Sequence, residues 1–198
     1  MASNCTSTRT EIRRHPERAR SERSDLEGVL DQALICHVGF VVDGAPVVIP
    51  TIHARDGAVL YLHGSPASRM LRSLAGGIDV CVTATLLDEV VLAKSWMHHS
   101  LNYRSAVIFG RASPVDDADT KLAALRIIVE HVQRGRAAQA RPPSDKELAG
   151  TLVLSVPLEE WSVKARVGPP LDDEADAPLS WWAGVLPVPA ERLGGAPA

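Results

Sequence analysis

Residues 35–63 read ICHVGFVVDGAPVVIPTIHARDGAVLYLH. Three runs of apolar and β-branched residues stand in this stretch, and such runs are typical of β-strands. They are separated by Asp43-Gly44 and Asp56-Gly57, dipeptides that favour tight hairpin turns. Three strands joined by two tight turns make an antiparallel meander. We therefore predict strands over residues 35–42, 46–55 and 58–63.

Helices and further strands are expected on both sides of the meander. The capping-box pattern Ser24-Asp25-Leu26-Glu27 predicts a short helix over residues 25–33. Pro66 suits the first turn of a second helix over residues 65–75, and Gly76-Gly77 suits its end. The remaining predicted elements are a hairpin of residues 78–86 and 90–96 around Leu87-Asp88-Glu89, a strand over 104–112, a helix over 116–132 with Leu122, Leu125, Ile128, Val129 and Val132 on one apolar stripe, and a strand pair or one broken strand over 151–156 and 161–167.

The number of strands and their connections indicate the architecture. About six to seven strands with mainly meander connections and peripheral helices are typical of a closed or nearly closed antiparallel barrel. We therefore expect a mainly β (α+β) fold. Residues 24–187 are expected to form a single domain between a polar, Arg-rich leader (1–23) and a tail (188–198). The leader is expected to be either a flexible surface arm or an arm that folds over a partner subunit or an anionic cofactor.

Composition excludes several classes of protein. The chain has 198 residues, 45% of them hydrophobic, and its net charge of −3 argues against a bulk nucleic-acid binder. No run approaches the roughly 20 apolar residues of a membrane-spanning helix, and the polar N-terminus lacks the apolar stretch of a secretory signal. We expect a soluble, cytoplasmic protein. Cys5, Cys36 and Cys81 lack the spacing of a disulfide framework or a zinc site, and the last two are expected to be buried.

The segment His63–Arg69 is the first candidate site. It follows a predicted strand and opens a predicted helix, and the free amides of a helix's first turn attract anions. Ser65 and Ser68 add hydroxyl donors, and Arg69 adds a planar cation that suits phosphate. The alternative is that Ser65 only caps the helix and that Arg69 faces water.

Three further groups of residues are candidates for ligand contact. The run Met97–Ser105 is dense in polar donors and includes a second cation, Arg104, although it also suits a polar connecting loop. We expect no metal there, because adjacent histidines point in different directions and no Cys or further His stands nearby. Pro50 indicates that its strand lies at an edge or carries a bulge. Lys164 and Arg166 share one face of the last strand, where they either meet an anion or face water.

Five short motifs follow one another along the chain: Cys36-His37-Val38-Gly39-Phe40, Ile49-Pro50-Thr51, Tyr61-Leu62-His63-Gly64-Ser65 with Ser68-Arg69, His98-His99-Ser100 with Asn102-Tyr103-Arg104-Ser105, and Trp182-Ala183-Gly184-Val185-Leu186-Pro187. In order and spacing the chain resembles the pyridoxamine 5′-phosphate oxidase-like flavin-binding family, in the branch that includes nitroimidazole reductases. The resemblance covers roughly residues 14–187. It implies an FMN-binding split β-barrel and a homodimer with the flavin at the subunit interface.

The resemblance also implies roles for individual residues. The backbone of Pro50-Thr51 would lie against the isoalloxazine ring. His63 stands where that branch has a histidine near the flavin, which makes it the candidate catalytic residue. Lys94 and Trp96-Met97 depart from the family pattern, which has Arg and a smaller residue followed by Phe, so the substrate side is expected to differ. The residues expected to bind the cofactor are Pro50, Thr51, His63, Gly64, Ser65, Ser68, Arg69, His98, Asn102, Tyr103, Arg104 and Lys164.

The function implied by the resemblance is that of an FMN-dependent oxidoreductase. NADH or NADPH would reduce the flavin, and a small electrophile such as a nitro compound would receive the electrons. His63 or His98 is the candidate proton donor. The alternative is a non-catalytic protein that holds a flavin, a haem or a deazaflavin as a store, sensor or carrier. Neither a membrane nor a nucleic acid is an expected partner.

Overall fold

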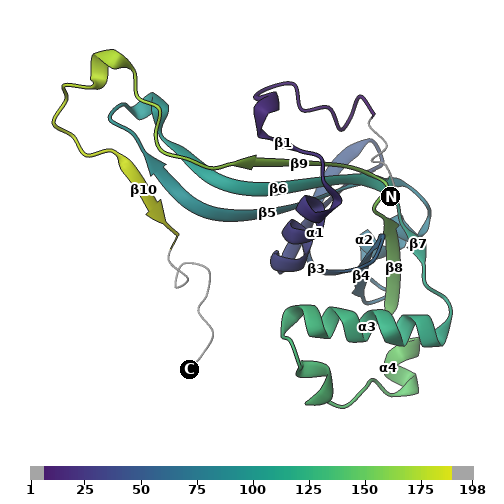
Figure 1. The fold of residues 1–198 in the computed structure, drawn as a ribbon. Helices are drawn as coiled ribbons and strands as arrows, with labels where there is room; N and C mark the ends of the chain where they lie inside the picture. Colours follow the sequence, from purple (N-terminus) through teal and green to yellow (C-terminus); the bar gives the residue numbers. More distant parts are fainter. Residues whose placement is uncertain (1–6, 189–198) are drawn as a thin grey trace.

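One antiparallel sheet dominates the molecule (Figure 1). The computed structural model describes residues 7–188. Within this range ten strands are hydrogen-bonded in the order β1-β9-β6-β5-β2-β3-β4-β8-β7, with β10 beside β5, and no ladder joins the two ends of this order. The barrel is therefore split rather than closed. The strands are β1 (Ala19–Arg20), β2 (Ile35–Val42), β3 (Ala45–Asp56), β4 (Val59–Gly64), β5 (Asp79–Leu92), β6 (Ser100–Arg111), β7 (Ser113–Pro114), β8 (Leu152–Pro157), β9 (Glu160–Arg166) and β10 (Gly184–Pro187).

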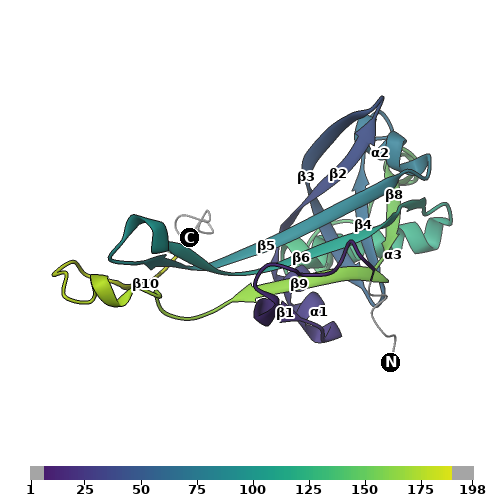
Figure 2. The same cartoon turned by 90° about the horizontal axis from the view of Figure 1, so that it is seen from above.

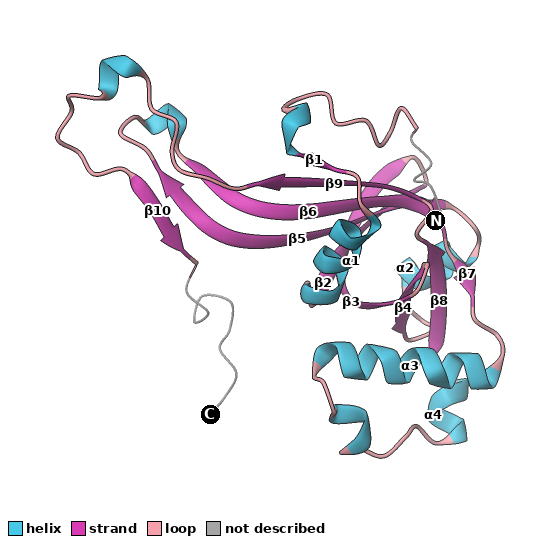
Figure 3. Ribbon diagram, viewed as in Figure 1, coloured by secondary structure: helices cyan, strands magenta, loops and turns pink. Residues whose placement is uncertain are grey.

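The helices lie at the periphery of this sheet, as Figure 3 shows. The first packs against β3, β5 and β6, the second against β7 and β8, and the third against β3, β4 and β8. The predicted mainly β fold, an antiparallel split barrel with peripheral helices, is confirmed. The α-helices are α1 (Arg23–Gln32), α2 (Arg69–Ala75), α3 (Ala118–Val132) and α4 (Asp145–Ala149), and short 3-10 turns are η1 (Pro16–Arg18), η2 (Trp96–His98), η3 (Arg136–Ala138) and η4 (Glu174–Asp176).

Alternate residues of the strands build the core of the barrel. Leu60 and Leu62 of β4 are fully buried, whereas their neighbours Tyr61 and His63 are partly exposed on the opposite face. Burying a leucine stabilises the fold by roughly 1.5–3 kcal/mol, so a sheet with one such face has a strongly specified register. Cys36 is buried as predicted, and burial raises the pKa of its thiol to about 12, whereas Cys81 is only partly buried because it lies on the face of β5 opposite the core.

The meander predicted from residues 35–63 is confirmed. Asp43 and Gly44 both have positive φ, 53° and 77°, as a two-residue turn matched to the twist of a hairpin requires. The ladder between β2 and β3 then runs without a break from Val42–Ala45 to Ile35–Ile52. The second turn contains Gly57 with a φ of 52° and lies one residue later than predicted, because β3 continues to Asp56.

Both early helices begin at other residues than predicted. The N-cap of α1 is Glu22, and the predicted capping box at Ser24 does not form. The side chain of Arg23 instead donates to the carbonyl oxygens of Leu158 and Gly57, which fixes an earlier start. Residues 65–68 form a turn in which the Ser68 amide donates to the Ser65 carbonyl over 2.9 Å, so α2 begins only at Arg69.

The largest difference from the sequence-based prediction is in β5. The predicted hairpin around Leu87-Asp88-Glu89 is wrong, because β5 is one continuous strand of 14 residues. Asp88 is an extra residue at which the register against β6 shifts, so it is a bulge rather than a turn. Strand β6 likewise begins at Ser100, within the expected polar loop. Beyond the barrel, β5 and β6 project together as an arm (Figure 2).

The C-terminal part of the chain returns along this arm. Strand β10 pairs with β5, and the segment before it lies at the far end of the arm (Figure 1). Trp181 and Trp182 are 64% and 62% exposed, so they lie outside the core of the barrel. Strands β8 and β9 pair with different partners, β4 and β6, which agrees with a broken strand rather than a pair.

The leader is held on the barrel in its described part. Strand β1 pairs with β9, Arg9 forms an ion pair with Glu160 at 2.5 Å, and its guanidinium lies 5.0 Å from the Phe109 ring centroid. Cys5 lies outside the described residues. Among the helices of residues 7–188, none has the length and apolarity needed to cross a bilayer.

Candidate functional site

The end of β4 presents an imidazole with an unused nitrogen. The side chain of His63 points away from the core leucines, and its Nδ1 is inaccessible to solvent without a hydrogen-bond partner in the described structure. Burial lowers the pKa of His63 below its ordinary value. Burial therefore favours the neutral ring, the form in which histidine binds a metal and in which it is a poor proton donor.

The residues after β4 combine hydroxyl groups with a free cation. The Ser65 hydroxyl accepts from the Ala67 amide over 3.1 Å, and the Ser68 hydroxyl accepts from the Leu71 amide over 3.4 Å. Both hydroxyl hydrogens remain available to a ligand. Arg69 is exposed, and its guanidinium has no partner within residues 7–188. Gly64 lets α2 approach, since a Cβ there would lie 3.0 Å from Leu71 Cδ1.

Pro50 and Thr51 lie next to this segment. The β3–β4 ladder pairs His53 with Leu62, and the same register, continued past the end of the ladder, sets Thr51 opposite Gly64. At Pro50 the strand pairs with β2 alone, so its other side is an open edge. The edge position predicted for this proline is therefore right, and no bulge is present because the β2–β3 register is unbroken.

The side of β3, β2, β5, β6 and β9 that faces away from the core is called the outer face below. Ile35 opposite Ile52, His37 opposite Pro50, and Gly39 opposite Val48 are cross-strand pairs on this face. Val48 is 64% exposed, and Ile35 is 50% exposed. Exposed apolar side chains gathered on one face of a sheet are typical of an interaction surface. Tyr103 and Lys164 lie on the same outer face, on β6 and β9.

Other predicted cofactor residues already have partners. Asn102 is 1% exposed; its Nδ2 donates to Glu89 over 2.6 Å, and its Oδ1 accepts from buried Arg166. Arg104 forms an ion pair with Asp88 at 2.8 Å. These contacts hold the base of the arm together. Lys164 Nζ donates to a leader carbonyl, and His98 lies at the turn of the arm, apart from the His63–Arg69 segment.

Sequence reasoning missed the apolar outer face. Along β2 and β3 both alternating sets of residues are apolar, which is the pattern of strands covered on both sides. That signal could have drawn attention to Ile35, Val48 and Ile52, which are exposed large apolar residues on this face. Sequence reasoning also missed the carboxylates of Asp172 and Asp176 near His98, because they come from a distant part of the chain.

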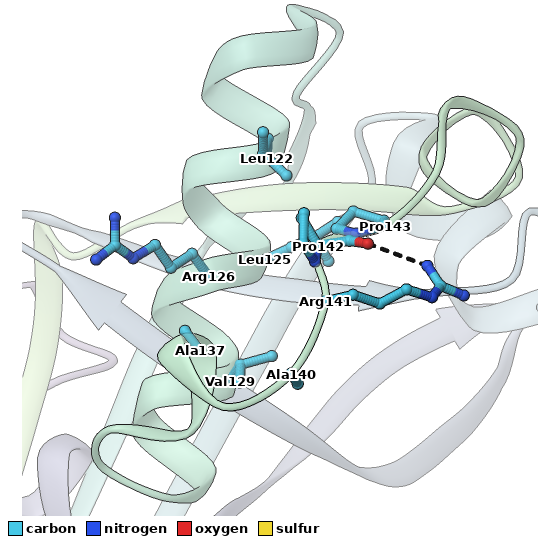
Figure 4. Close-up of a pocket in the computed structure, with 9 residues that line it drawn as sticks. All are labelled: Leu122, Leu125, Arg126, Val129, Ala137, Ala140, Arg141, Pro142 and Pro143. Atoms are coloured by element: carbon cyan, nitrogen blue, oxygen red, sulfur yellow. Dashed lines mark hydrogen bonds between the residues drawn. The ribbon is translucent and has the colours of Figure 1, made fainter.

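A separate apolar cavity of about 210 Å³ lies outside the barrel (Figure 4). The predicted stripe of α3 is only partly directed to the core: Ile128 is buried, whereas Leu122 and Val129 are 38% and 37% exposed and line this cavity. None of its lining residues comes from β4, α2 or the outer face. The lining residues are Leu122, Leu125, Arg126, Val129, Ala137, Ala140, Arg141, Pro142 and Pro143.

Known proteins share both the sequence pattern and the fold. The sequence model of the pyridoxamine 5′-phosphate oxidase family matches residues 22–165. The flavocytochrome Anf3 from Azotobacter vinelandii is 38% identical, with a TM-score of 0.87, over 97% of this chain and 89% of that chain. A FAD and haem binding protein from Mycobacterium smegmatis is 37% identical, with a TM-score of 0.82, over 86% and 84% of the two chains.

A candidate 5-nitroimidazole antibiotic resistance protein from Bacteroides thetaiotaomicron is 25% identical, with a TM-score of 0.62, over 74% of this chain and 85% of that chain. Comparison with curated proteins gives no match. The family match covers more than half of the chain, and it agrees with the split barrel described above. The chain therefore belongs to the pyridoxamine 5′-phosphate oxidase family.

Proposed function

We propose that this chain binds a flavin nucleotide, FMN or FAD, through its phosphate at Ser65–Arg69 and serves as an oxidoreductase. The observation that carries the proposal is the guanidinium of Arg69, unpaired among residues 7–188, beside two hydroxyl groups whose hydrogens are available to a ligand. A guanidinium and hydroxyl donors together suit the oxygen atoms of a phosphate. The neighbouring edge of β3 at Pro50-Thr51 is open, which leaves room for a planar ring system beside the phosphate.

Haem is proposed as a second cofactor, and His63 as its iron ligand. Both relatives at 37–38% identity are haem proteins by name. Three described histidines, His53, His63 and His98, have a buried ring nitrogen without a hydrogen-bond partner. His53 is fully enclosed in the protein, and its ring centroid lies 5.2 Å from that of His131. His98 lies on the arm. Burial lowers the pKa of His63, which favours the neutral ring, and His63 stands next to Ser65–Arg69, so it would be the residue that holds a haem iron.

The proposed reaction assigns binding and shielding to the protein. A bound flavin would supply hydride and electron transfer from NADH or NADPH to a small electrophile such as a nitro compound. Arg69 and the two serines would fix the phosphate end, and the outer face would exclude water from the ring. Because burial lowers the pKa of His63 and favours its neutral form, its proposed role is that of a ligand rather than of the proton donor.

A second copy of the chain is the proposed partner on the outer face. Its exposed apolar residues surround the edge at Pro50-Thr51, so a subunit docked there would complete the flavin pocket. Val48→Asp is expected to convert a dimer into monomers and to weaken flavin binding, because the carboxylate would be buried without a partner. Sedimentation velocity measures the first effect.

Val132→Asp is the matched control for the dimer, since Val132 is 47% exposed on α3 and lies apart from the outer face. It should leave the dimer intact. A monomeric parent protein, or a dimer that survives Val48→Asp, would contradict the proposed interface.

The absorption spectrum of the purified protein tests the proposed function. We expect flavin bands together with a Soret band, and bleaching of the flavin bands on anaerobic mixing with NADH or NADPH. Denaturation should release FMN or FAD, which distinguishes the two nucleotides. A protein that neither contains nor takes up a flavin nucleotide would exclude the function. Flavin bands that neither nucleotide bleaches would favour the non-catalytic store or sensor.

A further inference from the structure

The turn of the arm brings a histidine and two carboxylates together. His98 stands in η2, between β5 and β6, while Asp172 and Asp176 stand in the segment that returns along the arm. One ligand atom from each of these partly buried side chains lies within 4.8 Å of the other two. The Nδ1 atom of His98 is buried without a hydrogen-bond partner. These residues lie outside the proposed flavin and haem sites.

Lys94 holds the segment that carries both carboxylates. The Lys94 amide donates to Asp172 over 2.7 Å. The Lys94 ammonium donates to the carbonyl oxygens of Ala177 and Leu179, over 2.6 and 2.8 Å, which fixes the loop around Asp176. Within residues 7–188, neither aspartate forms an ion pair with a lysine or arginine. Both carboxylates therefore remain available to a cation, while the third acidic residue, Asp173, lies 3.9 Å from His98 Nε2.

We propose that His98, Asp172 and Asp176 bind a divalent first-row transition-metal ion such as Zn²⁺. An imidazole with two carboxylates suits such an ion, whereas Mg²⁺ and Ca²⁺ prefer oxygen ligands alone. Metal–ligand bonds of about 2.0–2.2 Å require donor atoms about 3–4 Å apart, so small side-chain rotations close the site. Asp176 also lines a cavity of about 440 Å³, which gives the ion access from solvent.

The bound ion would fasten the returning segment to the arm. Its three ligands come from two chain segments, which the Lys94 hydrogen bonds also join. The segment carries the exposed Leu171 and Trp181, which are sites that chymotrypsin attacks in a loose chain. Metal binding is therefore coupled to the order of this segment.

Equilibrium dialysis of the full-length, chelator-treated protein against Zn²⁺ tests the site. We expect one Zn²⁺ per chain, and at least about tenfold weaker binding in His98→Ala and in the isosteric Asp176→Asn, since even the loss of outer partners of a ligand costs that much. His99→Ala and Glu174→Gln are matched controls, a neighbouring histidine and a neighbouring carboxylate, and should bind Zn²⁺ like the parent.

Equal losses in the controls and in the ligand variants would overturn the site, as would the absence of stoichiometric Zn²⁺ binding by the parent protein. Chymotrypsin digestion provides a second readout. Zn²⁺ should slow cleavage after Leu171 and Trp181 in the parent and not in Asp176→Asn. Protection that persists in Asp176→Asn would also count against the site. Zn²⁺ binding should be unchanged in His63→Ala, so the inference stands or fails apart from the proposed cofactors.

Discussion

FMN is expected to bind about 10- to 150-fold more weakly to Arg69→Ala than to the parent protein, while riboflavin loses no more than about twofold. Only FMN carries the phosphate, and a charge-assisted hydrogen bond to it contributes roughly 1.5–3 kcal/mol. Because Arg69 has no partner in the described structure, its removal breaks no existing ion pair. Fluorescence titration of the flavin-free protein with both ligands measures the two affinities.

Arg72→Ala is the matched control for this prediction. Arg72 is an exposed arginine on the same helix, and its side chain likewise has no partner among the described residues. Its removal should weaken FMN only slightly, through general charge. If Arg69→Ala weakens FMN and riboflavin equally, or if both arginine variants lose FMN equally, Arg69 is not the phosphate ligand.

A second large effect is expected from His63→Gly. This change should abolish the Soret band of bound haem while flavin binding persists, because it removes the proposed iron ligand and leaves Ser65–Arg69 in place. His63 is not needed for the core, since its side chain points away from the buried leucines of β4. Reconstitution of the cofactor-free protein with stoichiometric haem, followed by absorption spectroscopy, measures the effect.

Imidazole added to His63→Gly should restore the Soret band, since it fills the space of the lost ring and offers the same nitrogen to iron. A purely structural role of His63 would not permit this rescue. His98→Gly is the comparison variant, because His98 also has an unpartnered Nδ1. Loss of the Soret band in His98→Gly but not in His63→Gly would reassign the ligand to the arm.

Much of the barrel could be predicted because its signals are local. Asp43-Gly44 specifies its own turn, since both residues adopt positive φ there. The segment His63–Arg69, which is proposed to hold the phosphate, was also chosen from the sequence, although α2 begins later than Ser65. That shift arises from the Ser65–Ser68 hydrogen bond, which closes a separate turn before the helix.

The arm could not be predicted, because its signals are not local. Leu87-Asp88-Glu89 has the polarity of a turn, but Asp88 instead pairs with Arg104 on the neighbouring strand, and this contact becomes possible only when β5 and β6 lie together. The cluster at His98 depends in the same way on the return of Asp172 and Asp176 along the arm. Short-range sequence patterns contain no information on the pairing of β5 with β6 or on the proximity of Asp172 and Asp176 to His98.

The bulge at Asp88 determines on which face of the strand each following side chain of β5 lies. Side chains alternate between the two faces of a strand, so one extra residue in β5 moves the following residues to the face they would otherwise avoid. Strand β6 has no such insertion; Glu89 therefore comes to stand opposite Asn102, where its carboxylate accepts the 2.6 Å hydrogen bond. Substitution of Asp88 would alter one side chain. Its deletion would instead move every following side chain of β5 to the opposite face of the arm.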